Sequence, residues 1–417
     1  MIDEARTTTC CVVGGGPAGM MLALLLARAG VDVTVLEKHA DFLRDFRGDT
    51  IHPSTLELVD ELGFFDELER IPHQVVRRLH ADVNGARLTV ADLSALRGRH
   101  RYIHMMPQWD FLELLAAKAR ECPSFHLETC AEVVDLWMEG TRTVGVVYRQ
   151  GGVTKRLRAD VTFACDGRGS TLRDRVGARV VDLGAPMDVL WFRVPRREGD
   201  PDETYGVVRP GRMLVLIDRA TYWQVGCLIP KGERRRVEER GLDAFRASLV
   251  EMAPFFRDGR LDALDDWARV SGLRVQVNHL RRWFYPGLLF LGDAAHAMSP
   301  IGGVGVNLAV QDAVAAARLL VEPIRQRRVR TVDLARVQAR RWYPAAATQL
   351  AQTLVQRRVI RRVLEGRVVR PPVWLPRVLA LRPVRALVAR AIGSGVRPEH
   401  WRPPPTPAHP APPPTAC

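Results

Sequence analysis

The stretch that decides the fold is Thr9-Cys10-Cys11-Val12-Val13-Gly14-Gly15-Gly16-Pro17-Ala18-Gly19. Residues 9–13 have the pattern of a short buried strand, and an apolar helix is predicted from Pro17 to Ala29, where Gly30 ends it. Residues 31–36 predict a second strand. Strand, helix and strand in this order form a βαβ unit, which builds a parallel sheet with right-handed crossovers. The sequence therefore predicts an α/β fold.

The glycines of this stretch meet the GxGxxG pattern at Gly14, Gly16 and Gly19. In this pattern the first glycine makes the turn, the second admits a pyrophosphate, and the third lets the helix and the strand approach each other. Glu37 ends the second strand, where a carboxylate can accept hydrogen bonds from a ribose 2′-hydroxyl and would repel a 2′-phosphate. The pattern predicts a Rossmann-like domain that binds the ADP half of FAD or NAD, and not NADP.

Two later stretches favour FAD over NAD. Residues 288–291 predict an apolar strand, and Gly292-Asp293 at its end places a carboxylate where the ribityl hydroxyls of a flavin can donate to it. Residues 300–307 are glycine-rich and lead into a helix predicted over 308–320, whose positive end would stabilise a reduced isoalloxazine ring. For His296 a structural, hydrogen-bonded role is the favoured interpretation. NAD has no ribityl chain, so these residues indicate a flavin site.

A third stretch, residues 161–173, combines a buried-strand pattern, an Asp-Gly turn and a Ser/Arg helix start. Two interpretations of Asp166, Ser170 and Arg173 overlap: a self-satisfied turn and cap, or a loop that is ordered beside a bound dinucleotide. No second GxGxxG follows a strand in the sequence. A nicotinamide cofactor therefore lacks a Rossmann domain of its own, and we expect it to visit the flavin only transiently.

Together these motifs resemble the single-component (class A) flavoprotein aromatic hydroxylases, whose type member is para-hydroxybenzoate hydroxylase and which include the ubiquinone-pathway hydroxylases. The resemblance covers residues 9 to about 400 and includes Arg47, Gln108 and the ending Gly395-Val396-Arg397-Pro398-Glu399-His400. It implies FAD as cofactor, with NADPH or NADH as transient co-substrate. In such enzymes O₂ adds at the flavin C4a position, and the hydroperoxide transfers one oxygen atom to an electron-rich aromatic or polyketide-like small molecule. The flavin carries the chemistry, so no catalytic side chain and no metal are expected.

The resemblance also implies which residues contact each part of FAD. Those expected at the ADP half are Gly14, Gly16, Pro17, Ala18, Gly19, Glu37, Lys38 and Val133, the last through its backbone. Those expected at the phosphates, the ribityl chain and the flavin ring are Arg47, Gln108, Gly292, Asp293, Pro300, Gly302, Gly303, Gly305 and Val306. Asp166 is expected to act indirectly, by fixing the loop near the pyrophosphate.

From Val189 to about Val277 the pattern becomes β-rich, with a helix near residues 242–252, and predicts an inserted substrate domain. The bulky side chains that could cover an aromatic ligand are Trp191, Tyr205, Met213, Tyr222 and Trp223, with His104, Met105 and Met106 nearby. For each of them packing in a core is the alternative. The predicted domains are an FAD-binding domain (1–70, 100–180 and 278–365), a substrate-binding β-sheet domain (71–99 and 181–277), a C-terminal helical segment (366–396) and a proline-rich disordered tail (397–417).

Composition limits the remaining classes of function. The chain has 417 residues and a net charge of +14, but its basic residues gather toward the carboxyl end without a nucleic-acid-binding motif, so no nucleic-acid partner is expected. No uncharged apolar run is long enough to cross a membrane, although residues 371–392 leave a weak membrane-surface contact open. Seven cysteines without a CxxC pair indicate reduced thiols and a cytoplasmic location.

Three alternatives to a hydroxylase stay open at this point. The first is a flavin-dependent reductase or halogenase-like oxidoreductase on the same fold, although no Trp-x-Trp-x-Ile-Pro stretch of the tryptophan halogenases is present. The second is a flavin-binding protein without catalytic activity that acts at a membrane surface. The third is a simple NAD dehydrogenase. The sequence does not predict an oligomeric state.

Overall fold

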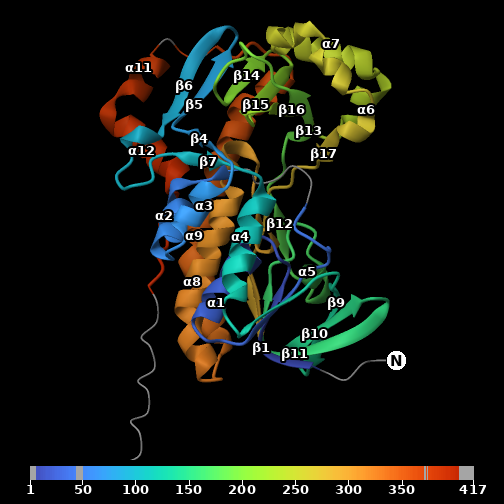
Figure 1. Ribbon diagram of the computed structural model, residues 1–417, viewed down its shortest axis with the longest axis vertical. Helices are drawn as coiled ribbons and strands as arrows, with labels where there is room; N and C mark the ends of the chain where they lie inside the picture. Colours follow the sequence, from blue (N-terminus) through green and yellow to red (C-terminus); the bar gives the residue numbers. More distant parts are fainter. Residues whose placement is uncertain (1–5, 44–49, 371, 373, 403–417) are drawn as a thin grey trace, which may run out of the picture.

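The computed structural model describes residues 6–43, 50–370, 372 and 374–402. Two sheet-based regions follow each other along the long axis of the molecule (Figure 1). The region drawn lower in the view holds the first strand, helix α1 and most of the long helix α8, and the region drawn upper holds a second sheet with helices α6 and α7. Arg47, one of the expected FAD ligands, lies outside the described residues.

The first region is an eight-stranded sheet with the order β19-β20-β11-β1-β2-β8, to which β10 and β9 are attached beside β11. Its strands are β1 (Arg6–Val13), β2 (Val33–Leu36), β8 (Phe125–Glu128), β9 (Glu132–Glu139), β10 (Arg142–Gln150), β11 (Val153–Ala164), β19 (Phe284–Tyr285) and β20 (Leu288–Phe290). Strand β1 pairs in parallel with β2 and with β11, and β11 pairs in parallel with β20. The predicted parallel α/β sheet is confirmed, and Cys10 and Cys11 on β1 are buried free thiols.

Helices cover this sheet and connect its strands. They are α1 (Pro17–Arg28), α2 (Pro53–Glu61), α3 (Phe65–Arg70), α4 (Gln108–Arg120), α5 (Thr171–Arg175), α8 (Gly305–Arg325) and α9 (Thr331–Val355), the last continued by a π-helical turn (Gln356–Ile360) and α10 (Arg361–Leu364). Within the described residues, one helical stretch, Ile301–Arg325, is long and apolar enough to cross a membrane. Because 78% of its most apolar window is buried inside the protein, it packs as a core helix.

The second region is a seven-stranded sheet with the order β17-β13-β16-β15-β14-β5-β6. Its strands are β5 (Arg78–Val83), β6 (Ala86–Asp92), β13 (Met187–Pro195), β14 (Tyr205–Arg209), β15 (Arg212–Asp218), β16 (Tyr222–Pro230) and β17 (Ser271–Leu273). Helices α6 (Arg234–Glu239) and α7 (Leu242–Met252) lie beside it. Two small sheets complete the fold: β3 (Thr50–Ile51), β7 (Ile103–Met105) and β4 (Gln74–Val76), and β12 (Val180–Asp182), β18 (Asn278–Leu280) and β21 (His296–Ala297).

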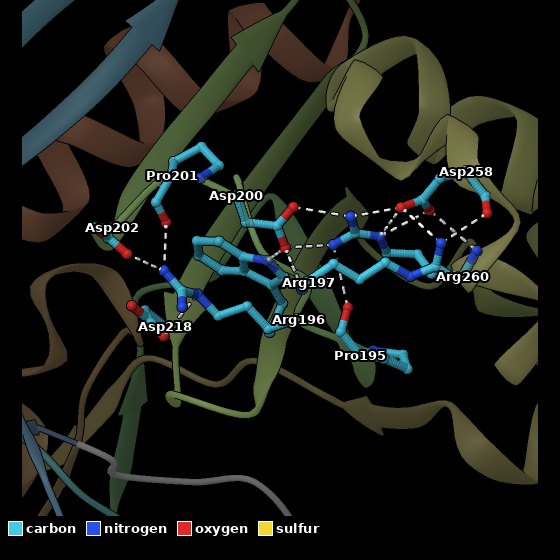
Figure 2. Close-up of polar contacts among 10 residues, drawn as sticks. Pro195, Arg196, Arg197, Asp200, Pro201, Asp202, Asp218, Asp258 and Arg260 are labelled. Carbon is cyan, nitrogen blue, oxygen red and sulfur yellow. Dashed lines mark hydrogen bonds and ion pairs between the residues drawn. The ribbon is translucent and has the colours of Figure 1, made fainter.

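The α7 side of the seven-stranded sheet carries a closed apolar core in which Trp223 is fully buried beside Phe192 and Phe245. A buried ion-pair cluster borders this core (Figure 2). Arg260, 3% exposed in its side chain, donates from Nη2 to Asp200 Oδ1 at 2.8 Å and to Asp258 Oδ2 at 2.7 Å. Hydrogen bonds from Arg260 lower the pKa of Asp258 to about 2.

Asp200 links this cluster to the core. Burial alone would raise the pKa of Asp200, but hydrogen bonds from Arg260, the Arg197 amide and Trp223 bring it below its usual value. Trp223 Nε1 donates to Asp200 Oδ2 at 2.8 Å, so the largest side chain of this core has its polar atom paired. Such a pairing removes the cost of burying a donor without an acceptor.

The carboxyl-terminal segment contains α11 (Leu375–Ala380) and α12 (Arg382–Gly393), which lie beside β6. Residues 397–402, expected within the disordered tail, pack against the first region instead. Glu399 is 2% exposed and accepts from Arg340 Nε at 2.6 Å and Arg318 Nη1 at 2.9 Å, and Trp401 is largely buried. The proline-rich composition predicted disorder because it does not show that one carboxylate and one tryptophan anchor the segment. Residues 403–417 lie outside the described part of the chain.

Candidate functional site

The glycine-rich loop between β1 and α1 contains glycines of two kinds. A Cβ atom on Gly14, whose φ is +101°, would lie 2.5 Å from the Cys165 carbonyl oxygen, and a Cβ on Gly19 would lie 2.0 Å from the Gly14 carbonyl oxygen. These two glycines are needed for close packing. A Cβ on Gly16 would meet no atom within 4 Å, so the loop is open there, in front of the first turn of α1.

The open position lies directly before the first turn of α1. Helix α1 has no acidic residue in its first turn and no side-chain cap, and Pro17 stands at its start. Helix N-termini present free backbone N–H groups and a partial positive charge. The loop therefore fits a phosphate-bearing group such as the diphosphate of a dinucleotide.

Glu37, at the end of β2, fastens this loop. Its carboxylate is 2% exposed, accepts from the Gly15 amide at 2.7 Å and accepts from the His39 amide at 3.0 Å. The Ala131 amide donates to the Glu37 carbonyl at 2.8 Å, which brings β9 and Val133 to the end of β2. Lys38 is exposed beside Glu37. The residues expected around an adenosine thus lie together.

The Asp-Gly turn after β11 is closed by its own hydrogen bonds. Asp166 Oδ2 accepts from the Leu172 amide at 3.3 Å, and the Ser170 hydroxyl caps α5 by accepting from the Arg173 amide at 3.2 Å. The turn-and-cap interpretation is confirmed for these groups. Burial raises the pKa of Asp166, and its Oδ1 atom is buried with no hydrogen-bond partner among the described residues.

Arg173 joins this turn to the Gly292-Asp293 segment. The buried guanidinium donates from Nε to the Ala294 carbonyl at 2.6 Å and from Nη2 to the Asp293 carbonyl at 2.7 Å. The Asp293 side chain remains about one third exposed, with Arg168 Nε 3.4 Å from Oδ2. Asp293 lies inside the 3₁₀ turn Gly292–Ala294, whose N-cap is Leu291, so its carboxylate is not the cap of that turn. Arg173 therefore fixes the backbone and leaves the carboxylate available.

His296 is buried and hydrogen-bonded, so the structural interpretation of this residue is confirmed. Its Nε2 lies 2.6 Å from Asp312 Oδ2, which also accepts from the Gly292 amide at 3.2 Å. Arg341 Nε donates to Asp312 Oδ1 at 2.9 Å. Burial alone would raise the pKa of Asp312, but His296 and Arg341 hold it below its usual value. The cluster anchors Gly292 to α8 and α9.

The loop before α8 contains Gly302 and Gly303, both with positive φ. A Cβ on Gly303 would lie 2.3 Å from Thr50 Oγ1, which donates to the Gly303 carbonyl at 2.8 Å. Helix α8 begins at Gly305, three residues before the predicted start. The amides of a first helical turn need no partner within the helix, so Gly305 can occupy it. The loop and the helix start can approach a flat ligand closely.

The five predicted substrate residues divide between the two faces of the seven-stranded sheet. Tyr205 and Trp223 lie in the closed core on the α7 side. Trp191 and Met213 lie on the opposite face, in an apolar cluster that includes Ile301 of the loop before α8. The Trp191 Nε1 atom is buried and has no hydrogen-bond partner within the described chain. Tyr222 lies near the strand end, where Arg193 stacks 5.0 Å from its ring centre.

A cavity of about 370 Å³ adjoins that apolar cluster. Its lining includes Leu183, Ala185 and Leu364, which pack against the same buried cluster as Trp191, Met213 and Ile301. The polar residues Thr353, Gln356 and Arg357 also line it. Cavities that hold small molecules have volumes of this order. Sequence reasoning missed these residues because they come from separate segments and carry no motif.

His104 and Met105 point to opposite sides of β7. Met105 packs with Ile217 of the second sheet, whereas the His104 ring contacts His73 and Tyr102. Burial, with smaller contributions from His73 and a further histidine, lowers the pKa of His104 to about 3, so the ring is neutral at neutral pH. Met106 is buried in the core of the first region, and Gln108 is the first residue of α4.

Comparisons with known proteins agree with this geometry. The model of the FAD binding domain family matches residues 6–351. The chain is 32% identical to 6-methylpretetramide 4-monooxygenase of Streptomyces rimosus, over 91% of this chain and 90% of that protein. The crystal structure of p-nitrophenol 4-monooxygenase from Pseudomonas putida superposes with a TM-score of 0.74 at 21% identity, covering 92% of this chain and 97% of that one.

A myxobacterial chondrochloren halogenase shares the same fold, with a TM-score of 0.74 at 18% identity over 91% of this chain and 90% of that one. The fold alone therefore does not distinguish monooxygenases from halogenases. The Streptomyces relative, which is matched over nearly its full length, is named as a monooxygenase. The chain belongs to the FAD binding domain family and is an FAD-dependent monooxygenase, with NADPH or NADH as its electron donor.

Proposed function

We propose that this monooxygenase hydroxylates a polyketide-like aromatic small molecule, held between the loop before α8 and the Trp191 face of the seven-stranded sheet. One observation carries the proposal: this apolar face meets Ile301 and contains a buried indole N–H without an acceptor among the described residues. A buried donor without a partner is costly, so a ligand oxygen is its natural acceptor. The Streptomyces relative makes 6-methylpretetramide a first compound to test.

FAD is proposed to lie along the three motifs in an extended conformation. Around its ADP half we place Gly14, Gly16, Pro17, Ala18, Gly19, Glu37, Lys38 and Val133, with Asp166 fixing the neighbouring turn. Around its ribityl chain and ring we place Gln108, Gly292, Asp293, Pro300, Gly302, Gly303, Gly305 and Val306. Arg47 keeps its predicted role at the phosphates. The open space at Gly16 and the partly exposed carboxylate of Asp293 support this placement.

When bound, FAD supplies the reaction with O₂ and the transfer of one oxygen atom to the substrate. The protein residues bind, orient and exclude water. The N-terminus of α8 carries a partial positive charge and no acidic residue in its first turn, which favours a negatively charged ligand beside Gly303. The Trp191 N–H would donate to a phenol or carbonyl oxygen of the substrate and so orient its ring. NAD(P)H is proposed to bind only transiently.

The decisive experiment follows labelled oxygen in the FAD-loaded enzyme. With NADPH or NADH and ¹⁸O₂, we expect 6-methylpretetramide, para-nitrophenol or another phenol to accelerate NAD(P)H oxidation and to gain one labelled oxygen atom. A reaction without substrate is the control. An unlabelled reduced product would support a flavin reductase, and a halide-dependent product would support a halogenase; either result contradicts the proposal.

The FAD placement has its own test. Asp293→Ala should weaken FAD retention by roughly 1.5 to 3 kcal/mol, because the ribityl hydroxyls lose a charged acceptor. Asp262→Ala, which removes an exposed carboxylate from the second region, is the control of equal charge. Glu37→Ala should also raise the FAD dissociation constant. Unchanged FAD binding in the Asp293 variant, measured by flavin fluorescence, would place the ribityl chain elsewhere.

A weak contact with an anionic membrane surface is a separate proposal about partners. Helix α12 exposes Leu387, and the residues Leu381, between α11 and α12, and Trp374, just before α11, are also exposed. Arginines on both helices lie near these side chains in the sequence. Apolar side chains beside arginines suit the boundary of an anionic bilayer. Vesicle flotation at low and high salt tests this: binding at low salt only is expected, and equal recovery without vesicles would contradict it.

A further inference from the structure

A cluster of three ligand-type side chains lies on the side of β7 that faces away from the second sheet. Glu69 is on α3, His73 follows that helix, and His104 is the middle residue of β7. Strand β4, which begins at Gln74, pairs with β7 so that Val75 lies opposite His104. His73 lies two residues before Val75, and its ring stacks on the His104 ring with the centroids 3.8 Å apart.

The ligand atoms are close together. Glu69 Oε2 lies 3.5 Å from His104 Nε2, Glu69 Oε1 lies 3.8 Å from His73 Nε2, and one atom of each residue falls within 4.8 Å of the others. A tetrahedral metal site with bonds of about 2.0–2.1 Å has ligand-to-ligand edges of about 3.3 Å. The two contacts run to different oxygens of Glu69, and each is within about 0.5 Å of that value. Bringing one oxygen and two ring nitrogens around a single ion requires small rotations of the exposed Glu69 and the partly exposed His73.

The two rings have the lone pairs that a metal requires. His104 is fully buried, and both of its ring nitrogens lack a hydrogen-bond partner among the described residues. His73 Nδ1 lies 2.7 Å from the Ile71 carbonyl, so Nδ1 carries the proton and Nε2 offers its lone pair toward Glu69. Such a backbone hydrogen bond on the outer nitrogen is the usual support of a metal-binding histidine.

We propose that Glu69, His73 and His104 bind one Zn²⁺ ion, with water as the fourth ligand on the exposed side of Glu69. Two imidazole nitrogens and one carboxylate oxygen suit this borderline metal, whereas magnesium and calcium prefer oxygen ligands throughout. The site is distinct from the FAD motifs. Its role is to tie α3 to β7, a strand that pairs through Met105 with Thr50, the residue that holds Gly303.

The alternative is a set of simple ion pairs between Glu69 and protonated histidines. Both carboxylate contacts, at 3.8 Å and 3.5 Å, are longer than ordinary charge-assisted hydrogen bonds. An ion pair also leaves the buried Nε2 atom of His104 without a partner at hydrogen-bond distance, whereas a metal ion would bind it. The two interpretations differ in what happens when Zn²⁺ is added.

The test uses the tag-free, FAD-loaded enzyme after treatment with a chelator and dialysis. Titration with Zn²⁺ by calorimetry should give one ion per chain and a higher melting temperature. Glu69→Gln and His73→Gln should each weaken Zn²⁺ binding at least about tenfold, the loss seen even for outer partners of metal ligands. Glu69 is exposed, so its variant should fold normally.

His126→Gln is the matched control. His126 is paired with one carboxylate, Asp32, at 3.2 Å, and the described residues place no third ligand beside that pair. Zn²⁺ affinity should therefore be unchanged in this variant. Binding that is absent in the unmodified enzyme, or that survives both Glu69→Gln and His73→Gln, would overturn the proposal. FAD content, measured in parallel, is expected to stay constant in all variants.

Discussion

The seven-stranded sheet places two tryptophans from neighbouring strands on opposite faces, and their surroundings differ. Trp223 on β16 is fully buried under α7 and donates its N–H to Asp200. Trp191 on β13 faces the loop before α8, and its N–H is buried without a partner among the described residues. Both residues are large aromatics in alternating strands, and the sequence pattern does not separate them.

The two tryptophans differ in whether the indole N–H has an acceptor, and not in the aromatic ring itself. A core closes when its buried donors and acceptors are paired, as they are around Arg260, Asp200 and Trp223 (Figure 2). A face that keeps a buried donor unpaired beside a cavity is arranged for a ligand. We therefore treat the α7 face as structural and the Trp191 face as the substrate face.

The largest expected effect tests the closed face. Arg260→Met should lower the free energy of unfolding by about 3–5 kcal/mol, because it leaves the buried Asp200 carboxylate without its cation. Denaturant unfolding of the FAD-loaded protein measures the change. Arg269→Met removes a surface arginine paired with Asp265 and should cost at most about 1 kcal/mol. Equal effects of the two substitutions would mean that the cluster in Figure 2 is not a stabilising centre.

The second prediction compares the two tryptophans directly. Trp223→Phe should destabilise the protein by about 1–3 kcal/mol, since it removes the donor to Asp200 and part of a packed ring. Trp191→Phe removes an unpaired donor, so its unfolding free energy should change less, while the KM for the substrate rises several-fold. The comparison fails if Trp191→Phe leaves KM unchanged and destabilises the protein as strongly as Trp223→Phe.

A smaller effect is expected from Gly226→Ala on the substrate face. The new methyl would lie 2.8 Å from Trp191 Cζ3, so the indole ring must turn away. We expect a raised KM and a destabilisation of about 1 kcal/mol, at the low end for overpacking. Gly206→Ala, on the same sheet but with ordinary contacts around its added Cβ, is the control for strand glycines. A normal KM in Gly226→Ala would argue against contact between Trp191 and the substrate.

The smallest effect is expected on the free energy of unfolding at acidic pH. The pKa of Asp258 is lowered from 3.8 to about 2, so its stabilising contribution is complete above 3.8 and is lost as the pH falls toward 2. The free energy of unfolding should decline over this interval, and less steeply in Arg260→Met. Because Asp258 is partly exposed, added salt should weaken the effect. An identical acid profile in Arg260→Met would mean that Arg260 does not lower the pKa of Asp258.

Much of the first region could be predicted because its residues obey local rules. The order strand, glycine loop, helix and strand around Gly14, Gly16 and Gly19 specifies a βαβ unit without further information. In the second region, helix α7 was also predicted with its observed bounds. The FAD contacts and the domain boundaries stay predictions, although Glu37 joins the glycine loop to the start of β9, where the ADP half is expected.

The parts that the sequence did not reveal depend on distant partners. Nothing local distinguishes Trp191 from Trp223, because the opposing strand and the covering helix decide which face is closed. The segment 397–402 was predicted as part of a disordered proline-rich tail. In the structure Arg318 from α8 and Arg340 from α9 pair with Glu399. The cavity beside Leu183 and Gln356 likewise forms only when segments far apart in sequence meet.

The anchoring of Gly292 has a consequence for the order in which the protein is assembled during synthesis. Asp312 holds the Gly292 amide and accepts from Arg341, which in turn donates to the Arg397 carbonyl at 3.3 Å. A ribosome makes the glycine loop first and residues 397–402 hundreds of residues later, and early segments fold before late ones. With FAD placed along Gly292 as proposed, tight binding should require residues 397–402, so nascent chains should be colourless and acquire the yellow cofactor only after Glu399 has docked.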